Sequence, residues 1–331
     1  MENDEVKGSI ISAFELTDPI DGRKIDAIEM RNEVGMRIIA IPGRALDLYA
    51  LDYDDCRISY LNEKAGISAH HFEEDGAKGF LKNFFGGMMT TCGLIQSGRP
   101  CEISGRSYGL HGCISNIPAQ NVGFSLDEDA LTVTGIVCEH HREGEHLKLS
   151  RTLRIERHEA RLTICDKVRN VGTIVSPMMM MYHINFGPPF LSKETKLTAT
   201  LWQALDRDTG KDTAAEEALA IAQEGNRDGE KVFYTRADLA EGFRIYNPRL
   251  KIGVHLTARG DGLRWTGIWQ NYVKERYALG IEPCNCPGIG CAQAKNDGIL
   301  PFLVPGETIQ NEVILALYKT NDADDGRGRA E

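Results

Sequence analysis

Apolar and polar residues alternate with period two along most of the chain, and clusters of Asp, Gly and Asn interrupt the alternation at short intervals. This alternation predicts strands with one buried face, and the interrupting clusters predict turns. A hairpin is expected over residues 243–258, with its turn at Asn247-Pro248. The other clear strand patterns cover residues 24–32, 35–41, 130–140, 146–156, 160–170 and 307–319.

Helical periodicity is rare, and its best instance is residues 213–226. Thr213 and Glu216 have the spacing of a capping box there, and Gly225 is suited to end a helix. No repeat of fixed period and no Pro- or Ser-rich linker divides the chain. We therefore expect one all-β, mainly antiparallel domain over residues 1–320, a sandwich or a closed sheet, followed by a polar, frayed tail at 321–331.

Composition and charge exclude several classes of function. The chain has 331 residues, 42% of them apolar, and its 38 Lys and Arg against 48 Asp and Glu give a formal net charge of −10. An acidic chain without clustered basic residues is a poor candidate for binding nucleic acid or an anionic membrane. The sequence has no 18-residue apolar stretch and no signal-peptide pattern, and its nine cysteines fit reduced thiols. We expect a cytoplasmic protein. A homodimer through an exposed edge or face stays an open alternative.

Two local motifs suggest other chemistry but lack the setting that it requires. GRSYG at 105–109 matches the G-x-S-x-G nucleophile elbow, yet no helical pattern follows it. Cys284, Cys286 and Cys291 are close in sequence, but their spacing matches no standard zinc site. A hydrolase and a metal site are therefore the less favoured interpretations.

Three stretches place ionisable side chains among apolar, Gly or Pro residues where strands are expected to end. They carry His111, His183 and Glu282, and they read YGLHGCISNIPA, YHINFGPPF and LGIEPCNCPG. A Glu and a His that meet at such ends could perform general acid–base catalysis, because burial raises the pKa of a Glu toward neutral pH. Each residue could equally be a hydrogen-bonded core residue, and sequence spacing does not show that the three meet.

The order of LHG at 110–112, YHINFG at 182–187 and GIEPCN at 280–285 on a β-rich chain resembles the galactose mutarotase-like superfamily. The match is closest to an aldose 1-epimerase-like branch, whose pattern also includes residues 42–48, 85–94 and 298–307. The resemblance implies a large twisted β-sandwich, the supersandwich, with a sugar cleft across one concave face. The strand pattern predicts the same class of fold.

The resemblance also implies an activity, that of an aldose 1-epimerase-like isomerase acting without a cofactor on a monosaccharide or sugar derivative. Glu282 would take the proton of the anomeric hydroxyl, and His183 would give a proton to the ring oxygen. A non-catalytic carbohydrate-binding or sensing protein on the same fold is the alternative. The substrate-binding residues that the resemblance suggests are His111, Tyr182, Asn185 and Trp269.

The chain departs from the pattern of this branch in two respects. Mutarotases carry an arginine in the segment that corresponds to residues 85–94, which has none here, and Arg44 or Lys82 could replace it. A cation at that place would favour an acidic or phosphorylated sugar. Cys113 and Cys291 stand where basic residues are usual, so the cleft gains two thiols if both face it. A metal held by these two cysteines and a histidine is the less favoured extension of this idea.

Overall fold

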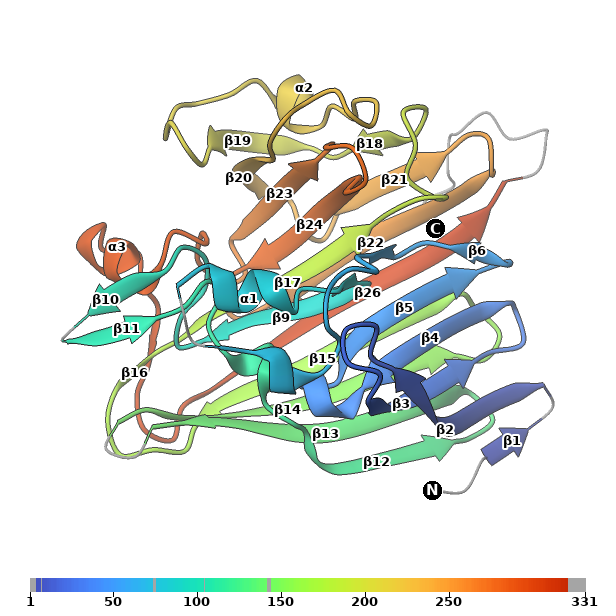
Figure 1. The fold of residues 1–331 in the computed structure, drawn as a ribbon, viewed down its shortest axis with the longest axis horizontal. Coiled ribbons are helices and arrows are strands. Elements are labelled where there is room, and N and C mark those ends of the chain that lie inside the picture. Colours follow the sequence, from blue (N-terminus) through green and yellow to red (C-terminus); the bar gives the residue numbers. More distant parts are fainter. Residues whose placement is uncertain (1–3, 7, 74–75, 104, 142–143, 321–331) are drawn as a thin grey trace.

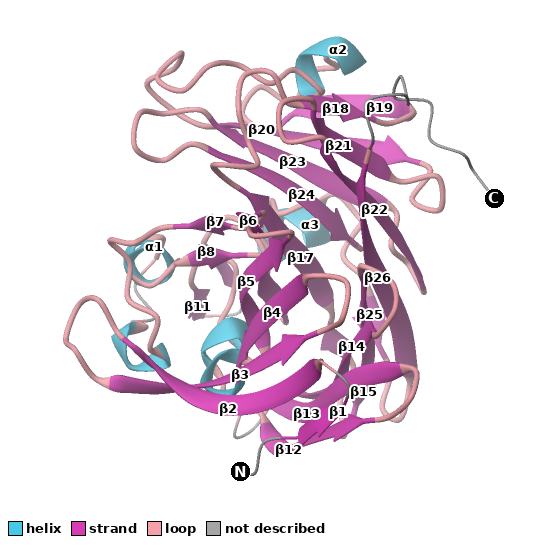
Figure 2. Ribbon diagram, turned by 90° about the vertical axis from the view of Figure 1, so that its right-hand side faces the viewer, coloured by secondary structure: helices cyan, strands magenta, loops and turns pink. Residues whose placement is uncertain are grey.

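Two large antiparallel sheets lie face to face in the computed structural model of the chain, which confirms the predicted β-sandwich (Figures 1 and 2). The structure describes residues 4–6, 8–73, 76–103, 105–141 and 144–320. The tail expected at 321–331 therefore lies outside the described residues. None of the helices within these ranges has the length and the apolar character needed to cross a membrane.

The larger sheet has twelve strands. Its spatial order is β1 (Asp4–Val6), β2 (Ser9–Thr17), β3 (Lys24–Arg31), β4 (Met36–Ile41), β5 (Asp47–Tyr53), β9 (Met89–Leu94), β17 (Met179–Phe186), β24 (Ala278–Cys284), β23 (Trp265–Asn271), β20 (Lys231–Ala237) and β19 (Leu201–Asp206), while β6 (Cys56–Arg57) pairs with β5. The centre of this sheet thus joins strands that are far apart in the sequence.

The smaller sheet has eight strands, and shorter elements surround both sheets. Its order is β12 (Gln120–Leu126), β13 (Ala130–His140), β14 (His146–Glu156), β15 (Arg161–Asn170), β26 (Thr308–Lys319), β22 (Ile252–Gly260), β21 (Phe243–Asn247) and β18 (Lys196–Thr198). Three two-stranded sheets pair β7 (Tyr60–Leu61) with β8 (Gly86–Gly87), β10 (Cys101–Ile103) with β11 (Arg106–Tyr108), and β16 (Ser176–Pro177) with β25 (Phe302–Leu303). The α-helices are α1 (Lys78–Lys82), α2 (Ala215–Ala218) and α3 (Cys291–Asn296), and the 3₁₀ turns are Pro42–Arg44, Ala69–His71 and Ile114–Asn116.

The period-two patterns predict the strands correctly. In β14 and β15 buried residues alternate with more exposed ones over almost the whole strand, because one face of the smaller sheet packs against the larger sheet and the other faces solvent. The hairpin predicted at 243–258 is formed by β21 and β22, with Asn247 paired to Ile252 across the turn. Sequence periodicity was sufficient to predict these strands because each of them has one face exposed to solvent.

The helix predicted at 213–226 is wrong in its length, because α2 covers only Ala215–Ala218. The expected capping box is also absent, since the helix has no side-chain cap and the Thr213 N–H donates to the carbonyl of Ala204. Carbonyl groups that would continue the helix accept hydrogen bonds from side chains of the neighbouring sheet region instead. Gln270 donates to the carbonyls of residues 217 and 218, Tyr272 to that of residue 220 and Tyr277 to that of residue 222.

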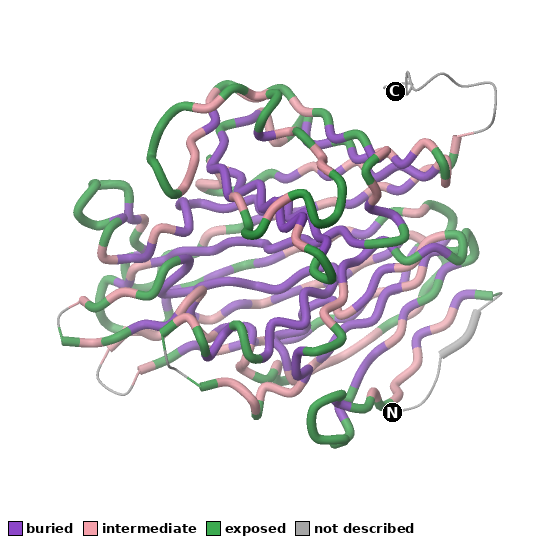
Figure 3. The backbone as a smooth tube through the Cα atoms, turned by 45° about the horizontal axis from the view of Figure 1, so that its top comes forward, coloured by how far each residue is buried: buried purple, intermediate pink, exposed green. Residues whose placement is uncertain are grey.

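Strand β17 is buried on both faces, as are its neighbours β9 and β24. Figure 3 shows buried residues concentrated in the middle of the molecule. Met180, Tyr182 and Ile184 belong to the core between the two sheets. Met181 belongs to a separate apolar cluster on the opposite face of the larger sheet, and alternation puts His183 on that same face. The methionines of this run therefore pack into two different apolar clusters.

A buried ion pair network joins the two sheets. Arg151 in β14 donates two hydrogen bonds to Asp166 in β15, at 2.9 and 2.7 Å. Its third nitrogen donates to Asp47 Oδ1 in β5 at 3.1 Å and to Thr91 Oγ1 in β9 at 2.8 Å. The side chains of Arg151, Asp47 and Asp166 have no solvent exposure, so removing one charge leaves the others buried without compensation.

We expect Arg151→Met to lower the free energy of unfolding by about 3–5 kcal/mol, because it leaves the carboxylates of Asp47 and Asp166 unpaired in the core. The matched control is Arg154→Met in the same strand, since Arg154 pairs with Glu156 at the surface. That change should cost less than about 1 kcal/mol. Urea unfolding of the three proteins measures both values, and equal losses in the two variants would contradict a structural role of the network.

Candidate active site

His183 and Glu282 meet because their strands are neighbours in the larger sheet. The pairs Met181 with Cys284 and Ile184 with Ile281 put His183 directly opposite Glu282 across β17 and β24. His183 Nε2 lies 3.2 Å from Glu282 Oε1, and the two side chains are only 6% and 4% exposed. Cross-strand register thus brings together two residues that are 99 positions apart. The sequence pattern placed both residues at strand ends, but both lie inside their strands.

Asn185 fixes the protonation pattern of the His183 ring. Its side-chain nitrogen donates to the carbonyls of Gly86 and His183, at 3.2 and 2.9 Å, so its oxygen must be the atom that faces His183 Nδ1. An amide oxygen only accepts, and His183 Nδ1 therefore carries a hydrogen. The nitrogen that can gain or lose a proton is Nε2, which is the one facing Glu282.

Two glycines leave room for the carboxylate of Glu282. A Cβ atom at Gly267 would lie 2.5 Å from Glu282 Oε2, and one at Gly280 would lie 2.7 Å from Oε1. Burial raises the pKa of Glu282, and the positive charges of His183 and Arg207 oppose this rise only in part. Apart from His183 Nε2, which lies 3.2 Å away, Oε1 has no polar partner among the described residues. A buried carboxylate with a raised pKa is suited to accept a proton.

His111 reaches the same place from the turn after β11. Its backbone has a positive φ of 61°, and its peptide group donates to Gly98 O at 2.9 Å and accepts from Gly93 N at 3.0 Å. The next residue must be glycine, because a Cβ at Gly112 would collide with the carbonyls of Gln96 and Gly93. The ring of His111 lies 5.7 Å from that of His183. Burial, with the charges of His183 and Arg207, lowers the pKa of His111 to about 3, so its imidazole is neutral at pH 7.

These three residues line one cavity of about 570 Å³, a size typical of small-molecule sites. Aromatic rings form part of its wall, with Trp269 and Phe84 at 5.2 and 5.1 Å from the His183 ring. Such a wall suits the apolar face of a sugar, and polar groups at its margin suit the hydroxyls. The lining also includes Tyr60, Phe80, Asn62 and Asn271.

Arg207 and Glu230, which adjoin the ends of two paired strands, also line the cavity. Arg207 directly follows β19 and Glu230 directly precedes β20, and the two side chains form an ion pair of 2.8 Å. Glu230 also accepts a hydrogen bond of 2.7 Å from Trp269 Nε1, and Arg207 pairs with Asp208. Burial alone would lower the pKa of Arg207, but these carboxylates raise it. The site therefore contains a fixed cation.

The structure does not bring four of the predicted binding residues to the cavity surface. Tyr182 packs in the core between the sheets, on the face of β17 opposite His183, and Asn185 is buried behind His183. Arg44 is 1% exposed and donates to the carbonyls of Ser115, Ile67 and Asn83. Lys82 pairs with Glu73 at the surface. His111, His183, Trp269 and Glu282 do line the cavity.

Sequence reasoning missed Arg207 and Glu230, the charged pair of the cavity, and the rings of Phe80 and Phe84. The two phenylalanines were detectable as an aromatic pair four residues apart around the short helix α1. No local sequence pattern indicated a role for Arg207 or Glu230, because each is a single charged residue in a polar loop. Only the pairing of β20 with β19 on one side and with β23 on the other brings them beside Trp269.

The cysteines do not extend the site. Neither Cys113 nor Cys291 lines the cavity, and Cys291 Sγ lies 3.3 Å from the sulfur of Cys101 instead. The GRSYG motif also forms no elbow, since Ser107 lies in the short strand β11 and a turn follows it. The thiols of Cys113 and Cys291 and the hydroxyl of Ser107 therefore lie outside the cavity.

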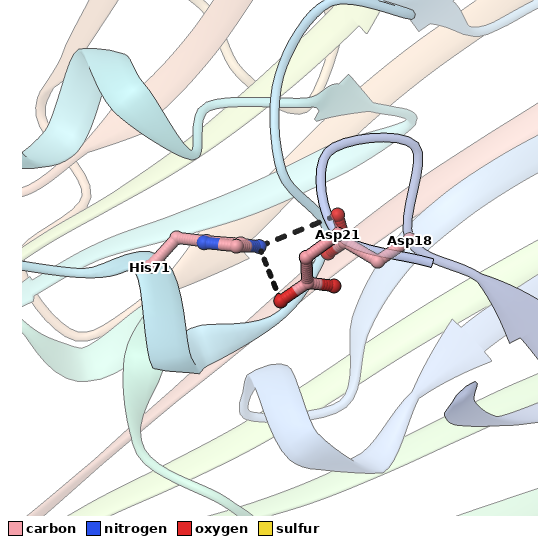
Figure 4. A group of neighbouring side chains, drawn as sticks. All are labelled: Asp18, Asp21 and His71. Carbon is pink, nitrogen blue, oxygen red and sulfur yellow. Dashed lines mark ion pairs between the residues drawn. The ribbon is translucent and has the colours of Figure 1, made fainter. Parts of the chain in front are cut away.

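Asp18, Asp21 and His71 form the only group of three His, Cys, Asp or Glu donors within 4.8 Å of one another in the described ranges (Figure 4). His71 Nε2 lies 3.3 Å from Asp18 Oδ1 and 3.6 Å from Asp21 Oδ2. Asp18 already accepts hydrogen bonds from the N–H groups of Ile20, Ile67 and Ser68. The trio therefore ties the turn after β2 to the segment around residues 67–71, a structural role.

A second cavity of about 620 Å³ has a different character. Charged side chains that pair with one another dominate its lining, as Arg37 does with Asp52 at 2.8 Å. It lacks aromatic residues, and none of the histidines of the described chain lines it. The cavity at His183 and Glu282 is therefore the candidate active site.

Comparisons with known proteins agree with this architecture. The family model "Domain of unknown function (DUF4432)" matches residues 22–317. No curated protein matches the sequence. A candidate aldose 1-epimerase from Klebsiella pneumoniae has a similar structure, with a TM-score of 0.80 and 22% identity over 94% of this chain and 84% of that one. A galactose mutarotase-like protein from Clostridium acetobutylicum has a TM-score of 0.68 and 14% identity, over 94% of this chain and 99% of that chain.

A galactose 1-epimerase from Lactobacillus acidophilus is also similar, with a TM-score of 0.63 and 14% identity over 94% of this chain and 98% of that chain. At these identities the likeness concerns the fold. The fold is thus that of the galactose mutarotase-like proteins, as the three short motifs had predicted.

The half-buried, neutral His111 makes stability sensitive to acid. Its pKa is about 3 in the folded chain and about 6.5 when unfolded, so acidification through this window protonates the unfolded state first. Between pH 7 and pH 5 the unaltered chain should lose about 2 kcal/mol of stability that His111→Gln does not lose.

Urea unfolding at both pH values measures this difference. His70→Gln, at an exposed histidine, is the control and should show the same loss as the unaltered chain. If the His111→Gln and His70→Gln proteins lose equal stability on acidification, His111 is not held neutral by burial.

Proposed function

We propose that this chain, which belongs to the family "Domain of unknown function (DUF4432)", is an aldose 1-epimerase-like isomerase that interconverts the anomers of a monosaccharide or sugar derivative. The observation that carries the proposal is the direct opposition of His183 and Glu282 on the wall of an aromatic-lined cavity. An acid and a base that touch one small cavity are what anomer exchange requires. The names of the structural neighbours support the same class of reaction.

Glu282 is the general base of the proposed reaction, and His183 is the general acid. Glu282 takes the proton of the anomeric hydroxyl, the C1–ring oxygen bond breaks, and the ring oxygen receives a proton from His183 Nε2. The resulting aldehyde rotates about the C1–C2 bond, and the ring closes from the other face. Closure uses the same two groups in exchanged roles, by microscopic reversibility, so the protein returns to its initial protonation state.

The environment of the pair fits these roles. The raised pKa of Glu282 makes its carboxylate a stronger base than a solvated one, and His183 is the only polar partner of Oε1 among the described residues. The neutral ring of His111 has an unpartnered Nδ1, which suits a hydrogen bond to a sugar hydroxyl. Trp269 is held by Glu230, which suits a fixed contact surface for the sugar ring.

Loss of either proton-transfer group should abolish most of the activity. We expect Glu282→Gln and His183→Ala each to reduce the rate at least about 100-fold, because general acid–base groups contribute factors of this size. The assay adds protein to a fresh, anomerically pure sugar and follows anomer exchange by NMR, over a panel of neutral, acidic and phosphorylated sugars. Glu156→Gln, in a surface ion pair, is the control and should leave the rate unchanged.

Two outcomes of this assay oppose the proposal. Normal turnover by Glu282→Gln would mean that another group is the base. Failure of the unaltered chain to accelerate exchange of any sugar, combined with measurable sugar binding, would favour a carbohydrate-binding or sensing protein instead.

The space beside Glu282 offers a second test that leaves both catalytic groups in place. Gly267→Ala puts a methyl group 2.5 Å from the position of Glu282 Oε2, so the carboxylate must move. We expect a loss of at least about tenfold in the rate, because a catalytic group that is displaced by about 1 Å loses much of its effect. Gly123→Ala in β12 is the matched control, since its Cβ would meet only Thr134 Oγ1 at 3.6 Å. Similar rates for both alanine variants would show that the position of the carboxylate is not critical.

A further inference from the structure

Two cysteine sulfurs lie within contact distance beside the candidate active site. Cys101 is the first residue of β10, Cys291 is the first residue of α3, and their sulfurs are 3.3 Å apart. Both are free thiols, 190 positions apart in sequence. A disulfide requires a sulfur–sulfur distance of about 2.05 Å, so an approach of about 1.3 Å would form one. Strand β10 pairs only with β11, in a sheet of its own, so this movement leaves the two large sheets intact.

The buried amide of Gln96 aligns the two thiols. Its oxygen accepts from the N–H of Cys291 at 2.7 Å and from the Cys101 thiol at 3.4 Å. Its nitrogen donates to the carbonyl of Arg99 at 2.7 Å. One side chain therefore connects the segment that carries Cys101 to the residue that begins α3. The thiol contact belongs to an organised site, because a fully buried amide is bonded to both cysteines.

The same junction forms part of the cavity lining. Gly98 and Ile289 form a β-bridge, and Arg99 N donates to Gly288 O at 3.2 Å. Gly98, Arg99 and Gly288 line the cavity, and the carbonyl of Gly98 accepts the N–H of His111. A covalent bond between the cysteines would fix the segment of Gly98 and Arg99 to the segment of Gly288 and Ile289. Cys101 is only three residues from Gly98, whose carbonyl accepts the N–H of His111.

We propose that Cys101 and Cys291 are a redox modification site that forms a reversible disulfide and locks this side of the cavity. The oxidant is a low-molecular-weight disulfide such as oxidised glutathione. The Cys101 thiolate attacks one of its sulfurs, breaks its S–S bond and releases one small thiol. The Cys291 thiolate then attacks the Cys101 sulfur, forms the protein disulfide and releases the second small thiol. Two protein thiols are oxidised, one small disulfide is reduced, and the two protons end on the small thiols.

The surroundings assign the order of the two attacks. Cys101 is half-buried and can meet the small disulfide, whereas Cys291 has no exposed surface. Burial and the neighbouring Cys101 raise the pKa of Cys291 to about 12. Because only the thiolate attacks, bond formation should accelerate as the pH rises from 7 to 9.

The test uses the reduced full chain, incubated at pH 8 with oxidised glutathione. Peptide mapping without reductant should find one linkage, Cys101 to Cys291, and thermal unfolding should shift upward by about 5 °C or more, because the bond closes a very long loop. Dithiothreitol should reverse both effects. Cys101→Ser and Cys291→Ser should show neither effect, and Cys138→Ser, at a half-buried cysteine in β13, should behave like the unaltered chain.

Absence of the Cys101–Cys291 linkage in the unaltered chain overturns the proposal, and so does linkage of other cysteines. A linkage without a shift in thermal unfolding overturns the claim that it locks the junction. If a serine variant does not fold, mapping of the unaltered chain decides the question alone. None of these measurements uses a sugar, so they are independent of the proposed isomerase activity.

Discussion

Arg151 lies between the two sheets and is bonded to carboxylates of both, Asp47 in the larger sheet and Asp166 in the smaller one. Charges with no access to water are stable only when their partners stay in place, so this network restricts how the sheets can shift. It also includes Thr91 in β9, which pairs with Tyr182 in β17. Since His183 is the next residue of that strand, the position of the site is fixed from the core side.

Because side chains alternate along the central strands, core residues lie on one face of the larger sheet and the residues of the candidate site lie on the other. In β17 and β24, residues such as Tyr182 and Ile281 pack into the core, and their neighbours His183 and Glu282 point to the other face. Each strand is thereby buried on both sides, which explains why a run of methionines is followed directly by an imidazole. The core holds one face rigid, and the rigid strands hold His183 and Glu282 in register.

The site concentrates features that are unfavourable for stability. It holds a carboxylate whose pKa is raised by burial, an imidazole kept neutral by burial, and polar atoms without partners among the described residues. Gly267 and Gly280 contribute no side chain that could fill the space around Glu282. Such groups are expected where binding of a ligand supplies the missing hydrogen bonds. The surrounding network and the packed strands provide the stability that this arrangement requires.

Local sequence patterns determined the strands, the β-sandwich and the motifs around His111, His183 and Glu282, because period two and short motifs depend only on neighbours in the chain. Tertiary structure alone decided that Arg207 lines the cavity and that Arg44 does not. It also ended the helix predicted at 213–226, where carbonyls bond to side chains of a distant strand region.

The partner of Cys291 was decided in the same way, by a contact across 190 positions. A cation, a thiol or a carbonyl acquires its role from the residue that faces it, and strand order and register determine that residue. Periodicity says which face of a strand is apolar. It contains no information on which remote segment covers that face.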